Sequence, residues 1–399
     1  MAFDGIVLKQ ISEELSSCLI GGKVNKVYEP NSNEIIFGIY SGGKNYALLC
    51  NISSNNYRLH LTTTSKPNPL NAPNFCMLLR KHLVGARIKS ISTLSLERIV
   101  IINLEAYNEL NDLLTKTLVI ELMGKHSNII LLNENNKIID SLRHLDTLSG
   151  SLRDIMPTRE YILPTSDKED FYTVSKEQFL SKITGSITKS ISNNFTGISQ
   201  CFISSLIDKM QISDINYTNE ELSLLYDKIS SILSSLGTRN VICSKTLKND
   251  YTITLGSSDN NLQTNFFLDD FYNKKENDES ILIYRNNLLK LVLSALKKIS
   301  KKIANMNNKL NECNNMEQYR IYGELITSNL YQIDGNKKQN SITLANYYDE
   351  NKLIDIPLDN TISISYNAKK YFKKYHKLKN TLEIVTNQKI EAEQELDYS

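Results

Sequence analysis

The spacing of apolar residues at the start of the chain predicts one amphipathic helix. Asp4 is a suitable N-cap for a helix that runs to about Leu19, and Gly21-Gly22 ends it. The apolar residues of this segment recur three or four positions apart, which is the period of one helix face. They are Ile6, Val7, Ile11 and Leu15.

Short apolar segments separated by polar turns follow this helix and predict strands. Residues 34–40 and 45–50 flank Ser41-Gly42-Gly43-Lys44, a favourable hairpin turn. A helix at 74–84 follows the proline-marked loop 66–73. The other predicted strands cover 57–62, 98–105, 116–122, 128–133 and 137–143. This spacing favours a meander folded into a sandwich or barrel, and we expect the first domain to span residues 1–175.

Helical spacing replaces the strands in the middle of the chain. Short helices are predicted at about 175–183, 198–207 and 219–236, and Gly197 lies in the turn before the second of them. Extended segments at 241–247 and 251–255 then lead to the last third of the chain. We expect a second domain with its connector at 176–278.

The last third, residues 279–399, predicts a long antiparallel coiled coil. Apolar residues recur close to a heptad from Val292 to Cys313, and a helix over about 280–330 would be roughly 75 Å long. Segments 342–348 and 353–359 predict a β-hairpin, after which a lysine-rich helix returns. That helix should begin near Ser365 and pack on the outgoing helix through Leu378, Leu382, Val385 and Ile390.

The two helices of this coiled coil differ in length. The outgoing helix supplies about fifty residues and the returning helix only about thirty-five. We therefore expect the native gene product to continue beyond residue 399, and intact mass would test this.

Composition narrows the chemistry. The formal net charge is +2, so contact with a polyanion must depend on local basic patches. None of the six cysteines forms a CxxC pair, which argues against a zinc site or a disulfide framework and fits a reducing cytoplasm. The N-terminus resembles neither a signal peptide nor a membrane span, so we expect a cytoplasmic protein with no membrane partner.

Catalytic motifs are missing from the sequence. It contains no P-loop, HExxH, GxSxG or dinucleotide-binding fingerprint. Lys125-His126-Ser127 are adjacent, but neighbours in a strand point to opposite faces and cannot form a triad. We expect no catalytic residue, no metal and no cofactor.

Several segments resemble one known family. They are MAFDGIVLKQISEEL with GGKVNKVYEPNSNEIIFGIY, NAPNFCMLLRKHLVGARI, ELMGKHSNIILLN, NNFTGISQCF, YGELITSNLY, NYYDENKLIDIPLD and NAKKYFKKYHKLK. Together they resemble the NFACT family of ribosome quality control factors, the RqcH/NEMF type, also described in bacteria as fibronectin-binding proteins. The resemblance covers nearly all 399 residues.

This resemblance implies an α+β multidomain fold. The first domain would be a β-sandwich similar to formamidopyrimidine-DNA glycosylases, followed by a helix-hairpin-helix domain and a coiled-coil arm with a β-hairpin insert. A further RNA-binding domain would lie beyond this chain. Those glycosylases use an N-terminal proline followed by a glutamate, whereas this chain begins Met1-Ala2-Phe3-Asp4, so the fold would not carry the activity.

The resemblance also implies a function. The protein would bind a large ribosomal subunit that still holds a peptidyl-tRNA, through rRNA, and recruit alanyl-tRNA for template-free alanine tailing. The tail would mark the stalled chain for degradation. Two alternatives stay open: a surface adhesin that binds fibronectin, and a simple tRNA- or RNA-binding module.

The family carries an Asp-Arg pair implicated in holding tRNA, and the matching residues here are Glu97 and Arg98. Glutamate keeps the carboxylate, but its extra methylene alters the reach of a bidentate contact. The alternative is an exposed ion pair at the start of a strand.

Other basic residues are candidates for contacts with the RNA backbone, since phosphates need cations without fixed spacing. In the first domain they are Arg80, Lys81, Arg87, Lys125, His126, Arg143 and Arg153. In the returning helix they are Lys370, Lys373, Lys374 and Lys377, which share one helix face beside an aromatic seam. Each alone is also compatible with an ordinary solvated charge.

Overall fold

The computed structural model describes residues 3–107, 112–146, 153–246 and 249–398. The chain divides into two compact units, 1–277 and 278–399. The boundary predicted at residue 175 lies inside the first unit. One apolar core in that unit extends from Phe3 to Tyr272 and includes residues from both predicted domains.

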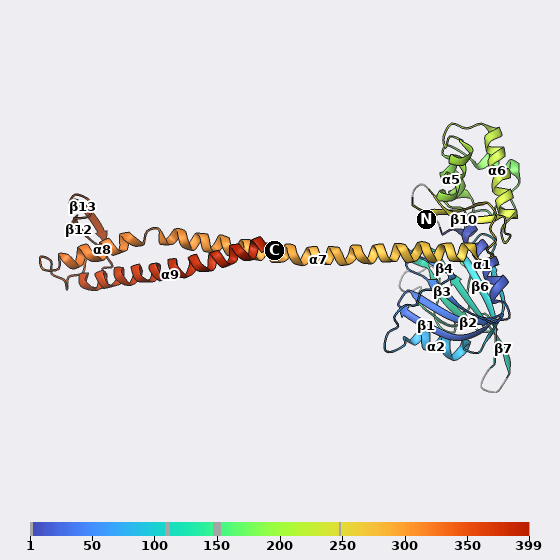
Figure 1. Cartoon of the computed structure of the whole chain (residues 1–399), viewed down its shortest axis with the longest axis horizontal. Coiled ribbons are helices and arrows are strands. Elements are labelled where there is room, and N and C mark those ends of the chain that lie inside the picture. The colour runs from blue at the N-terminus through green and yellow to red at the C-terminus, as the bar shows by residue number, and fades with distance from the viewer. Residues whose placement is uncertain (1–2, 108–111, 147–152, 247–248, 399) are drawn as a thin grey trace. The chain divides into compact units, whose positions relative to one another are not determined.

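The first unit contains a nine-stranded antiparallel sheet, which forms one end of this unit, away from α5 and α6 (Figure 1). Its strand order is β4-β3-β2-β1-β5-β6-β7-β8-β9, and the two halves meet where β1 pairs with β5 at Lys23 and Arg87, beside backbone hydrogen bonds that join Val24 to Gly85 and Ala86. The predicted meander is present, but hydrogen bonding joins all strands into one sheet, and β1 and β5 were not predicted. The strands are β1 Lys23–Asn31, β2 Glu34–Ser41, β3 Lys44–Asn51, β4 Arg58–Leu61, β5 Arg87–Thr93, β6 Ile99–Tyr107, β7 Leu113–Glu121, β8 Asn128–Leu132 and β9 Ile138–Ser141.

The predicted first helix is confirmed as α1 (Gly5–Leu19). The side chain of Asp4 accepts a hydrogen bond from the backbone N–H of Val7 at 3.0 Å, which satisfies a donor that the first turn leaves unpaired. All four of its predicted apolar residues are buried in the core. The second predicted helix is α2 (Asn74–Leu83).

Four short helices and a hairpin complete the first unit. Phe171, Phe179, Phe195 and Tyr226 pack ring against ring among these helices, with centroids 5.2–5.8 Å apart. The elements are α3 Lys176–Lys182, α4 Ile187–Asn194, α5 Gln200–Met210, α6 Asn219–Ser234, β10 Val241–Lys245 and β11 Tyr251–Leu255. The helix-hairpin-helix assignment stays a prediction.

The long helix α7 (Gln263–Cys313) begins earlier than predicted. A carboxylate from α1 stabilises its first turn: Glu14 accepts the backbone N–H groups of Thr264 and Asn265, both at 3.1 Å. The Asn265 side chain in turn accepts the backbone N–H of Leu61 at 2.8 Å. The start was missed because these contacts join segments that are far apart in the sequence.

A buried charge network fixes the next turns of α7 to the sheet. Arg58, 1% exposed, donates to Glu276 of α7, to Glu34 at 3.5 Å and to the His60 ring at 3.2 Å. Lys66 joins the two carboxylates at 2.7 Å and 2.8 Å. Every charge therefore has a partner of opposite sign, as burial of ions requires.

The second unit contains a helix pair and a small hairpin. A single helix over 280–330 was predicted, but α7 ends at Cys313 and α8 (Met316–Ser328) begins after Asn314-Asn315. Asparagine is a poor helix former, which accounts for the break. The predicted hairpin and returning helix are confirmed as β12 Ser341–Asn346, β13 Lys352–Pro357 and α9 Ile364–Tyr398.

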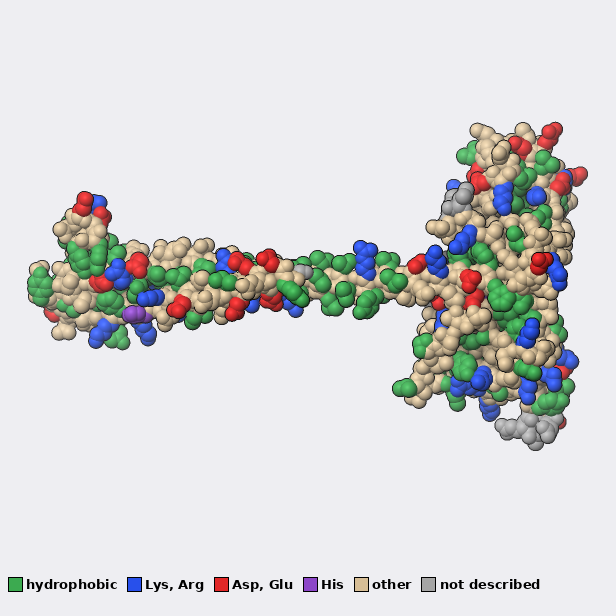
Figure 2. Space-filling view, in the orientation of Figure 1, with side chains coloured by type: hydrophobic (Ala, Val, Ile, Leu, Met, Phe, Trp, Pro, Cys, Tyr) green, Lys and Arg blue, Asp and Glu red, His purple; other side chains and the backbone are tan. Residues whose placement is uncertain are grey.

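Helices α7 and α9 run side by side in opposite directions (Figure 1). The thiol of Cys313 on α7 contacts the carbonyl of Leu378 on α9. Seven residues earlier on α7 and seven later on α9, Met306 and Val385 belong to one apolar cluster, so the contacts repeat with a heptad period. The prediction was wrong at Ile390, which is 50% exposed. Figure 2 shows apolar side chains gathered on α7 where α9 does not cover it. There the predicted heptad residue Val292 is exposed, as are Ile281, Leu282, Ile283, Leu288, Leu289, Leu291 and Leu293.

Candidate nucleic-acid interface

The turn that carries Glu97 and Arg98 connects β5 to β6 and is held through its backbone. The N–H of Glu97 donates to the Leu94 carbonyl at 2.8 Å, and the Arg98 carbonyl accepts the N–H of Leu122 at 2.8 Å. Leu96 is fully buried, whereas Glu97 and Arg98 are half-buried. The pair is therefore presented on a fixed backbone at the surface.

Two glycines enclose the Leu96 carbonyl. A Cβ on Gly5 would lie 1.8 Å from this oxygen, and one on Gly197 would lie 1.9 Å from it. The Gly5 N–H also donates to the Gly197 carbonyl at 2.8 Å. Only glycine permits such an approach, so the Asp4-Gly5, Leu96-Glu97-Arg98 and Gly197 segments converge because their backbones touch. Gly197, predicted from the sequence to lie in a turn between two helices, is thus part of this backbone junction.

Asp4 links this junction to a second helix. Besides capping α1, its carboxylate accepts the backbone N–H of Ser199, the N-cap of α5, at 3.2 Å. Burial raises the pKa of Asp4, while these hydrogen bonds and the positive charge of Arg98 oppose the increase. One carboxylate therefore orients two helix starts beside the Arg98 turn.

Arg98 is oriented by an aromatic residue that the sequence did not single out. Its guanidinium donates to the Tyr57 hydroxyl at 2.9 Å and lies 5.7 Å from the centre of that ring. Tyr57 is 2% exposed and packs edge-on against Phe3 at 6.1 Å. Among the described contacts of Arg98 this is its one hydrogen bond through the side chain, and a guanidinium has five N–H donors. The others can reach a ligand.

Glu97 lies beside Arg98 without a direct ion pair to it in the described part of the chain. Burial raises the pKa of Glu97, and the nearby charges of Arg98 and Lys168 partly oppose this. A carboxylate that is partly desolvated and lacks a bonded partner favours a ligand that donates hydrogen bonds, such as the edge of a base.

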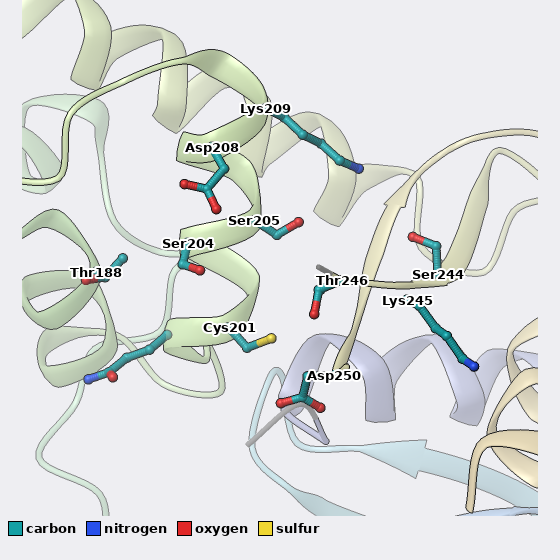
Figure 3. A pocket seen from close by; sticks show the side chains of 11 residues that line it. Thr188, Cys201, Ser204, Ser205, Asp208, Lys209, Ser244, Lys245, Thr246 and Asp250 are labelled. Atoms are coloured by element: carbon teal, nitrogen blue, oxygen red, sulfur yellow. The ribbon is translucent and has the colours of Figure 1, made fainter. Parts of the chain in front are cut away.

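A cavity of about 760 Å³ lies between α5 and the β10–β11 hairpin (Figure 3). In Figure 3, Ser204 and Ser205 of α5 face Thr246 and Asp250 across the hollow. Asp250 also lines a smaller cavity of about 80 Å³ together with Tyr57, so the two hollows adjoin beside the partner of Arg98.

The chemistry of this cavity argues against a nucleophile. Cys201 lines it, and its thiol donates to the Tyr251 carbonyl at 3.7 Å. Burial raises the pKa of Cys201 to about 11, so the thiol is protonated at neutral pH. No group of histidine, cysteine or carboxylate side chains in the described residues is arranged to hold a metal ion.

Two of the predicted RNA-contacting arginines are used inside the fold. Arg143 donates to the Asn33 side chain at 2.7 Å and to the carbonyls of Ile52, Ser127 and Lys125 at 3.0–3.3 Å. Arg153 forms a bidentate pair with the fully buried Glu121, at 2.7 Å and 2.9 Å. These arrangements satisfy the guanidinium groups with protein acceptors and indicate structural roles.

The remaining predicted cations of the first unit are placed differently. Arg80 donates to the Val27 carbonyl at 2.9 Å and is half-buried. Arg87 is exposed and donates to the Gly21 carbonyl at 3.2 Å. The exposed residues Lys81, Lys125 and His126 lie on α2 and in the 3-10 turn Gly124–His126. The structure does not bring these residues together with Arg98 through any described contact.

The predicted lysine cluster of α9 is partly engaged. Lys370 pairs with Asp359 at 2.7 Å, and the Lys374 ammonium lies 4.0 Å from the centre of the Tyr319 ring. Lys373 and Lys377 are exposed, without an ion pair to another described residue. Two of the four lysines thus contribute to packing of the second unit.

Comparison with known proteins identifies relatives along the whole chain. A family model for the NFACT N-terminal and middle domains matches residues 4–399. The Rqc2 homolog RqcH of Bacillus subtilis (strain 168) is 32% identical over 412 aligned positions, which cover 100% of this chain and 71% of that protein. RqcH of Streptococcus suis (strain 05ZYH33) is also 32% identical, with 97% of this chain and 68% of that protein covered.

A more distant relative is the human ribosome quality control complex subunit NEMF, 28% identical over 141 residues that cover 35% of this chain and 12% of that protein.

Within the described residues, no helix is both long and apolar enough to cross a membrane.

Solved structures agree with these relatives. The N-terminal part of the fibronectin/fibrinogen-binding protein from Streptococcus suis matches with a TM-score of 0.57 and 30% identity, over 69% of this chain and 100% of that one. The fibrinogen binding protein from Staphylococcus aureus matches with a TM-score of 0.58 and 28% identity, over 68% and 99%. The resemblance predicted from the sequence motifs is confirmed, and the chain belongs to the NFACT family.

Proposed function

We propose that this protein is a cytoplasmic ribosome quality control factor that holds tRNA at the Glu97–Arg98 turn. It would bind the stalled large ribosomal subunit with its peptidyl-tRNA and recruit alanyl-tRNA for template-free alanine tailing, which marks the nascent chain for degradation. The names of its relatives, RqcH and ribosome quality control complex subunit NEMF, support the general role.

The observation that carries the proposal is the state of Arg98. Arg58, Arg143 and Arg153 have carboxylates, carbonyls or ring nitrogens around their guanidinium groups. Arg98 has a fixed backbone, is half-buried, and has one described side-chain hydrogen bond, to Tyr57. A rigidly oriented arginine with donors to spare beside an unpaired carboxylate suits a nucleotide with both a phosphate and a base edge.

Affinity purification followed by sequencing of bound RNA tests this function. The wild-type chain should recover large-subunit RNA and alanine tRNA. Arg98→Ala should abolish tRNA recovery, while the matched variant Arg239→Ala, at an exposed arginine outside the turn, should retain it. Unchanged tRNA recovery by Arg98→Ala would remove Arg98 from the site.

The names of two similar solved structures favour a second candidate, binding of fibronectin or fibrinogen. Recovery in the cell-wall fraction and binding to immobilised fibronectin would support it. Co-sedimentation with free large subunits would support the ribosomal role instead. Recovery of tRNA without the large subunit would indicate a simple RNA-binding module.

A further inference from the structure

The part of α7 that lies in the second unit contains a basic surface. Residues 280–311 include seven cationic side chains and no aspartate or glutamate. In the described part of the chain, none of these cations has a carboxylate within ion-pair distance. They are Arg285, Lys290, Lys297, Lys298, Lys301, Lys302 and Lys309.

Four of these lysines line a groove of about 400 Å³ between α7 and α9: Lys298, Lys301, Lys302 and Lys309. Its apolar floor contains Met306, 8% exposed, and Val385, 6% exposed. The other lining residues, Asn305 and Gln388, are neutral. No acidic side chain of the described residues lines this groove, so its charge has one sign.

The helical repeat aligns the groove lysines in a row. Lys298 and Lys309 are eleven residues apart, about three turns, and Lys302 lies on the same side between them. The row is therefore about 16 Å long. Lysine stems can lie along apolar surface while their ammonium groups stay in water, and the apolar floor lowers the local dielectric, which strengthens attraction to an anion.

We propose that this groove binds the phosphate backbone of duplex RNA. The proposal rests on the proposed function, because ribosomal RNA would be the physiological ligand. A row of flexible ammonium groups with no aromatic side chain among the lining residues suits phosphates, which need charge but no fixed donor geometry. Lys370 and Lys374 of α9 differ, since each already has a partner inside the unit.

The test compares two triple variants of the full chain with equal loss of charge. The groove variant is Lys298→Gln, Lys302→Gln and Lys309→Gln. The control is Arg285→Gln, Lys290→Gln and Lys297→Gln, three exposed cations of α7 outside the groove. Binding of a short mixed-sequence RNA duplex is measured by fluorescence anisotropy over a series of KCl concentrations, with helix content checked by circular dichroism.

The groove variant should bind the duplex about tenfold more weakly or worse, and its log–log salt slope should fall by about one for each lysine removed. The control should stay within about twofold of wild type. Equal losses in both variants would mean long-range attraction by net charge and would overturn the groove. Duplex binding by the groove variant that equals wild type would overturn the proposal as well.

Failure of the proposed function gives a different result. A wild-type chain that does not co-sediment with large subunits would refute the ribosomal role, whereas duplex binding measured in vitro would still report on the groove. A groove variant that keeps tRNA recovery but loses duplex binding would show that the two surfaces act separately.

Discussion

Arg58 and Arg98 lie in the same unit and differ in how far their hydrogen-bonding capacity is satisfied. Arg58 is 1% exposed and contacts Glu34, Glu276 and His60. Arg98 is half-buried and bonds to Tyr57. Arg58 connects helix α7 to the sheet through Glu276, whereas Arg98 is oriented by Tyr57 and keeps N–H donors available for a ligand.

The neighbouring carboxylates differ in the same way. Burial tends to raise the pKa of Glu276, but Arg58 and Lys66 outweigh it and hold the pKa below its ordinary value. At Glu97 burial prevails and the pKa is raised. Complete pairing thus stabilises the charged form, and incomplete pairing leaves a group ready for a ligand.

The largest expected effect comes from breaking the saturated site, the network in which Arg58 and Lys66 pair with Glu34 and Glu276. Arg58→Met leaves Lys66 as the one cation of this network beside the buried Glu34 and the partly buried Glu276, which should cost about 3–5 kcal/mol of unfolding free energy. Arg98→Met removes one bond to Tyr57 and should cost about 1–2 kcal/mol. Urea unfolding followed by circular dichroism measures both. Equal losses would contradict the contrast between the two arginines.

Acid should weaken the saturated site selectively. The His60 ring accepts from Arg58 at Nε2 and faces the Leu61 carbonyl at Nδ1, so a second proton would point at a guanidinium. Burial and Arg58 lower the pKa of His60 from 6.5 to about 4. The pKa of His60 is lower in the folded state than in the unfolded state, so protonation favours unfolding. The contribution of neutral His60 to the unfolding free energy is complete above pH 6.5 and is lost as the pH falls to about 4, a decline of about 3 kcal/mol.

Unfolding free energies measured across this pH window test the prediction. His60→Gln should flatten the decline, and His126→Gln, at an exposed histidine, should not. A wild-type curve as flat as that of His60→Gln would show that the buried ring does not control acid stability.

The third effect concerns the backbone under Arg98. Gly197→Ala combines a φ of +70° with a Cβ 1.9 Å from the Leu96 carbonyl, so the turn must shift. We expect a loss of about 2 kcal/mol or more and weaker tRNA recovery. Gly185→Ala has a φ of +67° but nothing within 4 Å, and should cost about 1 kcal/mol with tRNA recovery intact. Similar tRNA recovery by both would exclude the backbone junction from function.

The smallest effect comes from one hydroxyl. Tyr57→Phe keeps the ring beside Arg98 but removes the hydrogen bond, which should lower the unfolding free energy by about 1 kcal/mol. Affinity for tRNA, measured by filter binding, should fall severalfold, whereas Tyr40→Phe, at an exposed tyrosine, should change nothing. Unchanged affinity would mean that ring packing alone orients Arg98.

Local patterns predicted the elements whose signals are contiguous. The cap at Asp4 and the Gly42-Gly43 turn depend on near neighbours, and the structure contains both. The heptad predicted from Val292 to Cys313 is buried at Ile299, Met306 and Cys313 but exposed at Val292. The start of α7 was missed because Glu14, 250 residues away, caps it.

The site was predicted only in part for the same reason. Glu97 and Arg98 were identified through the family resemblance, but no spacing indicates that Tyr57 orients Arg98 or that Gly5 and Gly197 enclose Leu96. The internal roles of Arg143 and Arg153 were missed because their acceptors, such as Asn33 and Glu121, lie on other strands. Exposure of basic residues cannot be read from composition.

The bond between Glu14 and the first turn of α7 has a consequence for biosynthesis. The carboxylate is translated early, but its backbone partner at Thr264 follows 250 residues later. At about 5–20 residues per second, the nascent α1 waits roughly 12–50 s for that partner. The first unit can therefore close only after most of its own translation, and a ribosome that stalls before Thr264 would hold an incomplete fold.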